Sequence, residues 1–340
     1  MSASNSPIIG ITMGDPAGIG PEIIVKALAD PSVYECSRPV VLGDSEVLSS
    51  IVLKLSDRTA LNAVAHAAEA EAIPGRINLL EISRLKSGSI LPGKPTVDGG
   101  KAMVAYITRG VNLTLKGELD ALVTCPINKA LMQRAGHHFE GHTQLIAHLT
   151  GSHDYVMMLA GKRLRVSLVT IHCPLKEVPV ILTAEAILKT IVITARALVE
   201  DFGLKKPCVA VCALNPHAGE SGLFGSEEEE IIGPAIEKAR ALGYSVEGPL
   251  PSDTLFFKAA SGRFDAVVAM YHDQGLIPLK LLHFSDAVNT TLGLPIIRTS
   301  VDHGTAYDIA GHGKADPSSL VAAIGMAAEM IKNRMSPKKG

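Results

Sequence analysis

Three histidines stand where apolar, strand-like segments give way to polar residues. They are His172, His217 and His272, and they follow residues 164–171, 208–216 and 264–271. In a parallel α/β sheet, ligand groups collect at the carboxyl ends of the strands. Three neutral imidazoles suit Zn²⁺, Co²⁺ or a similar ion and leave open positions for substrate oxygens. The sequence therefore predicts a three-histidine metal site, although the spacings are too long for a local zinc motif and a lone histidine is usually structural.

Cationic and polar residues follow His272 within a short stretch. Lys280 offers a point charge and Arg298 a planar fork, and Asn289 lies between them in the sequence. Lysine and arginine are the natural partners of a phosphate or a carboxylate, and simple exposure to solvent is the alternative interpretation of each one. A metal ion acts as a Lewis acid that stabilises an alkoxide. Together with an anion clamp, it would suit a small phosphorylated hydroxy acid.

Alternating strand-like and helix-like segments must position these residues. Apolar runs predict strands at residues 8–13, 38–43, 77–82, 121–124, 155–160, 164–171, 208–214 and 265–270. Helix-like patterns fall at residues 21–30, 99–116, 127–136, 183–201, 226–242, 254–260 and 316–332. This alternation predicts an α/β protein with a parallel sheet.

The composition limits both the fold and the partners. The chain has 340 residues, which suits two lobes better than one core. It is 47% hydrophobic but only 4% aromatic, with no Trp, so the core consists mainly of Ala, Val, Ile and Leu. A net charge of −2 gives no electrostatic reason to expect nucleic acid or an anionic membrane surface as a partner.

The sequence favours a cytoplasmic protein. Residues 1–6 have no basic segment, and no apolar run approaches the ~18 residues of a membrane span. The five cysteines are an odd number, which favours reduced thiols. Cys208 and Cys212 share one strand-like segment and are expected in the core. Cys173, next to His172, is not expected to bind the metal.

Three further polar segments each have two interpretations. Residues 14–22 match neither a dinucleotide fingerprint nor a P-loop, and they either bring backbone N–H groups to a ligand or only form a tight turn. Residues 136–153 are rich in histidine, and a loop with a short helix of exposed imidazoles is the plainer interpretation. His142 and Thr143 are the exception, because Thr143 can cap an apolar helix while both face a ligand. Asp253 falls in a segment typical of a helix cap.

Four blocks of sequence carry a resemblance to a known family. Residues 14–22, 215–220, 271–275 and 289–304 resemble the 4-hydroxythreonine-4-phosphate dehydrogenase family, and the match runs in order from about residue 8 to residue 332. More distantly, residues 18–22 and 303–311 resemble the isocitrate and isopropylmalate dehydrogenases. Those enzymes bind NAD(P) without a Rossmann fingerprint and hold their metal with carboxylates. The three histidines therefore mark the closer family.

The resemblance implies a fold and an assembly. The fold is the α/β, two-lobed fold of the isocitrate and isopropylmalate dehydrogenases, with layered sheets, helices on both faces and the active site in the cleft between the lobes. One lobe is expected at residues 1–130 and 296–340, with both termini and much of the dinucleotide site. The other, residues 131–295, carries the metal ligands and the dimer contacts. The family is homodimeric, with the site at the subunit interface and one histidine crossing from the partner.

The resemblance also implies roles for individual residues. The metal ligands are His172, His217 and His272. The phosphorylated substrate is bound by His142, Thr143, Lys280, Asn289 and Arg298. The nicotinamide cofactor is held by the loop that contains Asp302, His303, Gly304, Thr305 and Ala306. Asp253 and His142 are candidates for the proton acceptor, and a metal-bound water would also serve.

The activity implied is a metal-dependent oxidation linked to NAD or NADP, with Zn²⁺, Co²⁺ or Mg²⁺ as the ion. The substrate 4-phosphooxy-L-threonine is oxidised at C3 to 2-amino-3-oxo-4-phosphooxybutanoate, which loses CO₂ to give 3-amino-2-oxopropyl phosphate, a step in pyridoxal 5′-phosphate (vitamin B6) biosynthesis. Residues 221–225 and 276–278 look closer to a paralogous group that oxidises D-threonate or D-erythronate 4-phosphate. A metal-dependent aldolase or hydrolase of a sugar phosphate and a non-catalytic metabolite binder are the alternatives from other classes.

Overall fold

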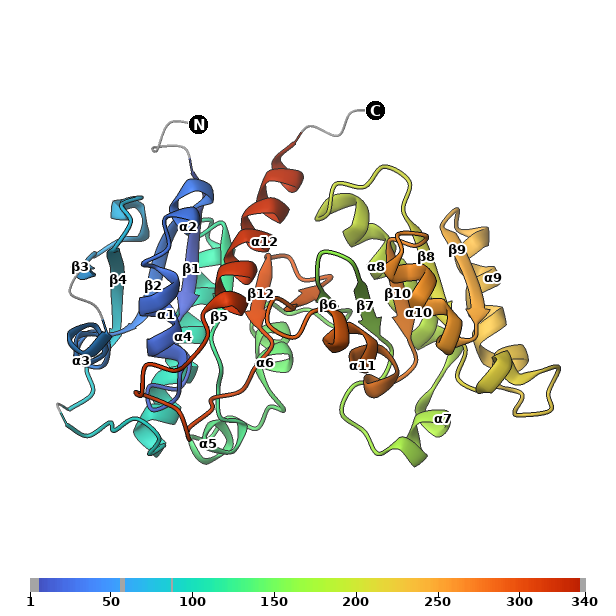
Figure 1. Cartoon of the computed structure of the whole chain (residues 1–340), viewed down its shortest axis with the longest axis horizontal. Helices are drawn as coiled ribbons and strands as arrows, with labels where there is room; N and C mark the ends of the chain where they lie inside the picture. Colours follow the sequence, from blue (N-terminus) through green and yellow to red (C-terminus); the bar gives the residue numbers. More distant parts are fainter. Residues whose placement is uncertain (1–5, 56–58, 87, 337–340) are drawn as a thin grey trace. The chain divides into compact units, whose positions relative to one another are not determined.

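The chain folds into two compact units, seen in the computed structural model drawn in Figure 1, which describes residues 6–55, 59–86 and 88–336. The first unit comprises Met1–His153 and Leu294–Lys332, and the second comprises Asp154–Gly293 and Asn333–Gly340. The terminal residues 1–5 and 337–340 lie outside the described residues. Both units are built from strands and helices, which confirms the expected α/β class.

The strands of the first unit pair in parallel throughout. In order across the sheet they are β3 (Ala60–Ala63), β4 (Arg76–Ser83), β2 (Arg38–Asp44), β1 (Ile8–Thr12), β5 (Ala121–Thr124) and β12 (Arg298–Val301). Parallel strands are covered on both faces, so their sequences are continuously apolar. Residues 40–42 of β2 are an example, since all three are fully buried.

Helices cover this sheet. Figure 1 shows α1 (Gly20–Ala27) and α12 (Ser318–Met335) in front of the strands and α4 (Val97–Leu115) behind them. Helix α4 packs against β1, β2, β4 and β5. The hydroxyl of Thr299 donates to the carbonyl of Ala323 (2.9 Å), which fixes α12 to β12. The remaining helices of this unit are α2 (Pro31–Cys36), α3 (Ser45–Leu55), α5 (Lys129–Arg134), α6 (His142–Leu149) and a 3₁₀ turn at Ala67–Glu69.

The boundary between the units lies after His153 and not near residue 130. Helices α5 and α6 pack against α4, so the segment after residue 130 belongs with the first sheet. The return to the first unit, at Leu294, falls close to the expected residue 296. Residues 333–336 are grouped with the second unit, whereas the sequence-based division left them in the first lobe.

The sheet of the second unit is mixed. Its strands lie in the order β11 (Val288–Leu292), β6 (Val156–Ala160), β7 (Arg165–Leu168), β10 (Ala266–Ala269), β8 (Cys208–Cys212) and β9 (Ser245–Leu250). Strand β6 is antiparallel to both β11 and β7, and the other neighbours are parallel. The expectation of a purely parallel sheet is wrong here. A tight turn, closed by Gly161 N–H to Leu164 O (2.9 Å), joins β6 to β7, and such a short connection can only join antiparallel strands.

Helices also cover both faces of the second sheet. Helix α8 (Ala184–Glu200) packs against most of its strands, and Figure 1 shows α10 (Ser252–Ala260) and α11 (His272–Leu282) on the side facing the viewer. A single apolar cluster that includes Val166, Val267 and Leu276 forms the core between α11 and the strands. The other helical segments are α7 (Val178–Ile181), α9 (Gly233–Ala241), 3₁₀ turns at Leu175–Glu177 and Pro216–Gly219, and a π-helix at Glu228–Ile232.

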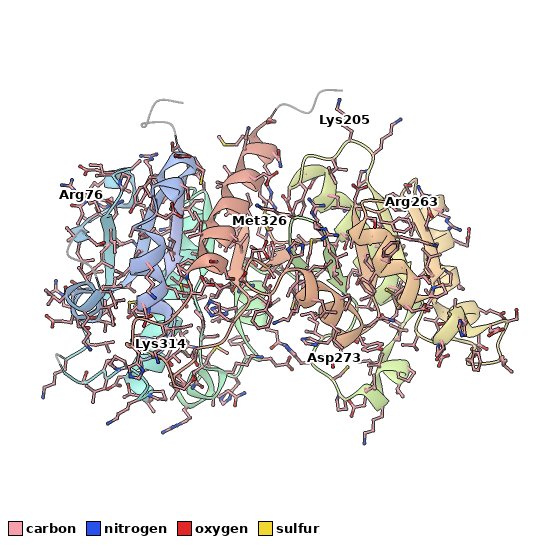
Figure 2. The ribbon with its side chains drawn as sticks, in the orientation of Figure 1. Arg76, Lys205, Arg263, Asp273, Lys314 and Met326 are labelled. Atoms are coloured by element: carbon pink, nitrogen blue, oxygen red, sulfur yellow. The ribbon has the colours of Figure 1, made fainter. Side chains whose placement is uncertain are left out.

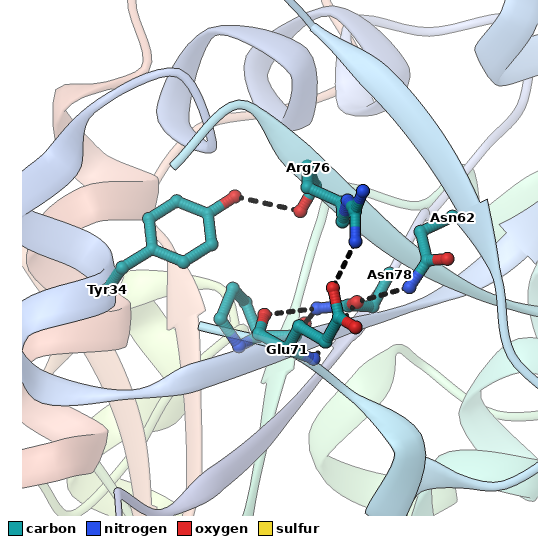
Figure 3. A network of polar contacts seen from close by, with 6 residues as sticks. Tyr34, Asn62, Glu71, Arg76 and Asn78 are labelled. Atoms are coloured by element: carbon teal, nitrogen blue, oxygen red, sulfur yellow. Dashed lines mark hydrogen bonds and ion pairs between the residues drawn. The ribbon is translucent and has the colours of Figure 1, made fainter. Parts of the chain in front are cut away.

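A polar network occupies the β3–β4 end of the first sheet (Figure 3). Buried Asn78 on β4 donates to the carbonyl of Glu71 (2.9 Å) and accepts from the side-chain amide of Asn62 on β3 (3.0 Å). An ion pair between Arg76 and Glu71 lies beside it. Because β12 is at the other end of this sheet, the network is structural and does not contribute to the site described below.

The cysteines bear on a further expectation from the sequence. All five cysteines are free thiols; Cys212 is buried as expected, whereas Cys208 is only partly buried.

No single helix among the described residues has the length and hydropathy of a membrane span. The pair Leu175–Ile181 and Ala184–Glu200 passes that test only when joined across a 92° bend, and most of its longer member packs on the second sheet.

Candidate active site

The three predicted metal ligands follow three neighbouring strands of the second unit. Strands β7, β10 and β8 are adjacent and parallel, so their carboxyl ends lie at one edge of the sheet. His172 follows β7, His272 follows β10, and His217 follows β8. This placement is what the strand-end argument required.

His172 and His272 lie together at this edge. Their ring centroids are 5.7 Å apart, with the rings tilted by 40°. Nδ1 of His272 is 2.7 Å from Oδ1 of the exposed Asp273, which is labelled in Figure 2. A carboxylate on one ring nitrogen fixes the imidazole and leaves the other nitrogen for a metal ion. Both rings line a pocket of about 590 Å³, which Cys173 and Tyr271 also line.

His217 lies apart from this pair. Its ring is 6.2 Å from the ring of Phe224, and its backbone has a positive φ of 53°. Over residues 6–55, 59–86 and 88–336, no three His, Cys, Asp or Glu side chains are grouped so that they could hold a metal ion. One chain therefore brings two of the three predicted ligands together, and the full set stays a prediction.

Gln274 ties the ends of the strands that carry these histidines. Its Oε1 accepts from Met270 N–H at the end of β10 (2.7 Å). Its Nε2 donates to the Ala213 carbonyl at the end of β8 (2.7 Å) and to the Ser252 hydroxyl at the start of α10 (2.9 Å). One amide side chain thus braces three elements at the histidine edge. The sequence signal was only its position two residues after His272.

Replacing Gln274 with leucine is expected to lower the free energy of unfolding by about 2–4 kcal/mol. The variant leaves the buried Met270 N–H without its partner, which costs about 1–3 kcal/mol, and it removes the shorter of the two hydrogen bonds to the Ala213 carbonyl, which costs about 0.5–1.5 kcal/mol. Urea unfolding measures the effect. The matched control is Gln133→Leu, an exposed glutamine on α5, which should change stability by less than about 0.5 kcal/mol. Equal effects in the two variants would contradict the bracing role.

A buried cation lies on strand β12 of the first unit. Arg298 on β12 is only 2% exposed, and its Nη2 donates to the hydroxyl of Thr124 on β5 (2.7 Å). Burial lowers the pKa of Arg298 to about 9, so the guanidinium is still protonated at neutral pH. The hydroxyl of Ser300 donates to the Thr124 carbonyl (3.1 Å) and holds the same strand ends together. A buried guanidinium of this kind is suited to an anionic ligand.

His142 stands beside this cation as the first residue of α6. Its pKa is lowered well below 6.5, chiefly by burial and further by the positive charges of Arg298 and Lys129. The imidazole is therefore neutral at pH 7. Its Nε2 is buried and finds no hydrogen-bond partner within the described part of the chain. A neutral imidazole with an unused nitrogen can donate to, or accept from, a bound ligand.

Thr143 does not cap α6, contrary to the sequence interpretation. The residue that precedes the helix is Gly141, and in the described chain no side chain caps this end. Thr143 is the second helical residue and is partly buried, so its hydroxyl is available at the helix start next to His142. The plainer interpretation of the histidine-rich segment is confirmed for His138, His148 and His153, which are all exposed.

The His142 environment predicts a pH dependence of stability. Because its folded pKa lies below the unfolded value of about 6.5, the unfolded chain binds a proton between these two values that the folded chain does not. Stability therefore falls as the pH drops below about 6.5, by up to about 1.4 kcal/mol per pH unit from this group. Urea unfolding at pH 7.5, 6.5 and 5.5 should show a shallower fall for His142→Gln. The exposed His148 on the same helix is the control, and His148→Gln should follow the wild type.

Two predicted substrate residues belong to the second unit. Lys280 lies in α11 and is partly buried. Asn289 lies on β11, and its buried Oδ1 has no hydrogen-bond partner in the chain as described. A buried amide oxygen of this kind calls for a donor, which a ligand hydroxyl or amine can provide. His142, Thr143 and Arg298 belong to the first unit, so the predicted substrate residues are divided between the two.

The predicted cofactor loop packs onto the glycine-rich loop at residues 14–22. Its Thr305 carbonyl accepts from Ile19 N–H (3.0 Å). A Cβ added at Gly18 would lie 3.0 Å from the same oxygen, so glycine permits the close approach of the two backbones. The loop that contains Asp302, His303, Gly304, Thr305 and Ala306 is therefore held against residues 14–22. Residues 14–22 do more than form a tight turn, because they support the predicted cofactor loop.

Two carboxylates that the sequence argument missed hold these loops together. Asp15 accepts from the Tyr307 hydroxyl (2.5 Å) through Oδ2 and from Ala17 N–H (2.9 Å) through Oδ1. Glu22 is fully buried and accepts from Gly311 N–H (3.1 Å) and from Ala315 N–H (2.8 Å). Burial raises the pKa of Asp15, while its hydrogen bonds act in the opposite direction. Both acids lie in residues 14–22, one of the blocks that carry the family resemblance, but only the fold reveals their partners.

Asp253 is not a helix cap. Helix α10 begins at Ser252, the preceding residue is Pro251, and no side-chain cap bond is present there in the described chain. Asp253 is exposed in the first turn, next to the Ser252 that Gln274 contacts. Its role as proton acceptor stays a prediction.

Known proteins are similar to this chain over nearly its whole length. The model of the family described as pyridoxal phosphate biosynthetic protein PdxA matches residues 35–327. A 4-hydroxythreonine-4-phosphate dehydrogenase of Desulforapulum autotrophicum is 57% identical over 324 residues, 95% of each chain. A D-threonate 4-phosphate dehydrogenase of Cupriavidus necator is 47% identical over 330 residues, 96% of this chain and 98% of that one. The crystal structure of 4-hydroxythreonine-4-phosphate dehydrogenase from Klebsiella pneumoniae superposes with a TM-score of 0.89 at 43% identity, covering 96% of this chain and 100% of that one.

Fold and relatives together define the class as a two-unit α/β oxidoreductase of the dehydrogenase type. Within that class, the chain belongs to the PdxA family. The family expected from the four sequence blocks is thereby confirmed.

Proposed function

We propose that the protein is a metal-dependent, NAD(P)-linked dehydrogenase that oxidises 4-phosphooxy-L-threonine at C3 and releases CO₂ from the resulting β-keto acid, in pyridoxal 5′-phosphate biosynthesis. The observation that carries the proposal is the buried Arg298 with the neutral His142 beside it, which suits the phosphate of a small acid. The names of the relatives support a phosphorylated four-carbon substrate.

The donor set fits a divalent ion in part. His172 and His272 are close enough to share one, and the Asp273 carboxylate on Nδ1 of His272 is a usual support of a metal-bound imidazole. We propose that His172, His217 and His272 hold Zn²⁺, Co²⁺ or Mg²⁺, with one of the three supplied by a partner copy. Such an ion supplies Lewis-acid polarisation of the substrate hydroxyl and of the keto acid that follows.

The side chains of the chain have separate tasks in this proposal. His142, Thr143, Lys280, Asn289 and Arg298 bind and orient the phosphorylated acid, with the cations Arg298 and Lys280 as partners of the phosphate. The loop from Asp302 to Ala306, which the residue 14–22 loop supports, holds NAD or NADP. Proton removal from the C3 hydroxyl falls to Asp253 or His142. His142 is suited to it because its pKa is low enough for the ring to be neutral at pH 7.

A homodimer is part of the proposal. Large apolar side chains are exposed on α11 and α7 of the second unit and in the segments next to them, among them Leu281 (81%), Val180 (80%) and Phe284 (84%). A surface with this many exposed apolar side chains is typical of a face that a second subunit covers. A partner bound there would approach the edge that carries His172 and His272, because α7 and α11 follow those histidines in the chain.

D-Threonate 4-phosphate is the second candidate substrate, favoured by relatives such as the Cupriavidus necator enzyme. The test is the NAD⁺- and NADP⁺-dependent rise in absorbance at 340 nm with 4-phosphooxy-L-threonine and with D-threonate and D-erythronate 4-phosphates. We expect the highest kcat/KM with 4-phosphooxy-L-threonine. A higher value with either sugar acid would reassign the substrate. A metal-dependent reaction of these phosphates without nicotinamide would overturn the dehydrogenase proposal.

A further inference from the structure

The loop that carries His217 has an unusual backbone. Its residues His217 (φ 53°), Ala218 (φ 56°), Glu220 (φ 43°) and Ser221 (φ 56°) all have positive φ, although none is a glycine. Residues other than glycine are strained in this region and persist only where the surroundings hold them. Something in the second unit must therefore hold the loop in place.

Glu228 contacts the beginning of this loop. It is only 4% exposed, and its Oε1 accepts from Leu214 N–H and from Asn215 N–H, both at 2.8 Å. Its Oε2 accepts from the side-chain amide of Asn215 (3.0 Å), which also donates to Oε2 of Glu227 (2.7 Å). Hydrogen bonds to a charged group are stronger than those between neutral groups. A buried carboxylate thus fixes the backbone immediately before Pro216 and His217.

The surroundings are shaped for this carboxylate. A Cβ at Gly219 would lie 2.8 Å from Oε2 of Glu228, so the loop can only approach the carboxylate there as glycine. A Cβ at Gly225 would lie 2.5 Å from the Asn215 amide nitrogen and from Oε2 of Glu227. Glu228 also begins a π-helical segment, a rare geometry that is frequent at functional sites. The loop therefore closes around the Glu228 carboxylate at Gly219, and around the Asn215 amide and the Glu227 carboxylate at Gly225.

We infer that Glu228 is a positioning residue for His217: it acts through the backbone of residues 214–215 and fixes where the imidazole of His217 is presented. This inference rests on the proposed function, in which His217 is a metal ligand. A histidine whose backbone is already held in place binds a metal ion with a smaller loss of conformational freedom. Loss of the Glu228 contacts should therefore lower the metal affinity as well as the activity.

The test compares Glu228→Gln with Glu229→Gln, an exposed neighbour that loses the same charge. A glutamine at position 228 must point its amide nitrogen either at the Asn215 amide or at the two backbone N–H groups, so donors face donors in both orientations. We expect hydrogen exchange of the amides at residues 214–225 to accelerate by about tenfold or more in Glu228→Gln, while exchange elsewhere is unchanged. The affinity for Co²⁺, followed by its visible absorption, should fall by about 10–100-fold, and Glu229→Gln should match the wild type in both measurements.

Asn215→Ala is the second variant, because it removes the side-chain contacts of Asn215 to Glu227 and Glu228 and keeps the two backbone N–H bonds to Glu228. It should show the same local acceleration of exchange to a smaller extent, and it decides the matter if Glu228→Gln does not fold. Unchanged exchange and Co²⁺ affinity in Glu228→Gln, with Co²⁺ lost in His217→Ala, would overturn the positioning role alone. Faster exchange at residues 214–225 in Glu228→Gln, together with no Co²⁺ binding by the wild-type protein, would instead overturn the proposed metal site. The role of Glu228 in holding the loop would then stand.

Discussion

Replacing Arg298 with methionine is expected to lower kcat/KM for the phosphorylated substrate by about 10³-fold, equivalent to about 4 kcal/mol. The guanidinium is 2% exposed and is held by the Thr124 hydroxyl, so its charge acts at short range and away from water. Removing one member of a buried charge pair typically costs about 3–5 kcal/mol, because the remaining charge has lost both its partner and its solvent. Steady-state kinetics with 4-phosphooxy-L-threonine measures the effect.

The same kinetics with 4-hydroxy-L-threonine, which lacks the phosphate, identifies what Arg298 binds. If the guanidinium binds the phosphate, the wild type and Arg298→Met should be nearly equal with the unphosphorylated compound. The matched control is Arg84→Met, because Arg84 is an exposed arginine of the same unit that pairs with nearby Glu81. An equal loss with both compounds would assign Arg298 to another part of the substrate or to the stability of β12.

Arg298 also illustrates what the sequence could not reveal. The sequence placed it in a polar stretch, but it opens β12, a buried strand that pairs in parallel with β5. Strand β12, with residues Arg-Thr-Ser-Val, has a single apolar side chain, and its polar side chains bond to Thr124 and to the Ala323 carbonyl. Apolar periodicity, the main sequence signal, is therefore weak at β12, whereas β8 and β10, which precede His217 and His272, are apolar and were located from the sequence.

The predictions that succeeded depended on apolar runs in the sequence and on a general rule for parallel sheets. Long apolar runs located β1, β2, β5 and β8, and the rule that parallel strand ends share an edge placed His172 and His272 at one edge. The contacts between separate loops could not be predicted, because they depend on the tertiary fold. Tyr307 with Asp15, and Gly311 with Glu22, are each joined across more than 280 residues of sequence. The backbone of His217 could not be predicted either, since residues other than glycine rarely adopt positive φ.

Replacing His272 with alanine is expected to lower Co²⁺ or Zn²⁺ affinity by at least about 10²-fold and kcat by about 10³-fold, because the substrate hydroxyl loses its Lewis acid. Asp273→Asn keeps the ring but weakens its support, and it should cost about 10–100-fold in metal affinity. Metal titration by visible absorption and steady-state kinetics measure both variants. His153→Ala, at an exposed histidine, is the control and should leave both quantities unchanged. Full metal affinity in His272→Ala would remove it from the ligand set.

Mixing two inactive variants tests whether His272 serves the partner's site. When His272→Ala and Arg298→Met subunits exchange freely, about half of the dimers combine one of each. If His272 and Arg298 act in the same site from different chains, each mixed dimer has one doubly defective site and one intact site, so about a quarter of the wild-type activity should return. If both residues act in the site of their own chain, every site keeps one defect and no activity returns. Recovered activity near a quarter therefore requires both a dimer and a ligand that crosses between its subunits.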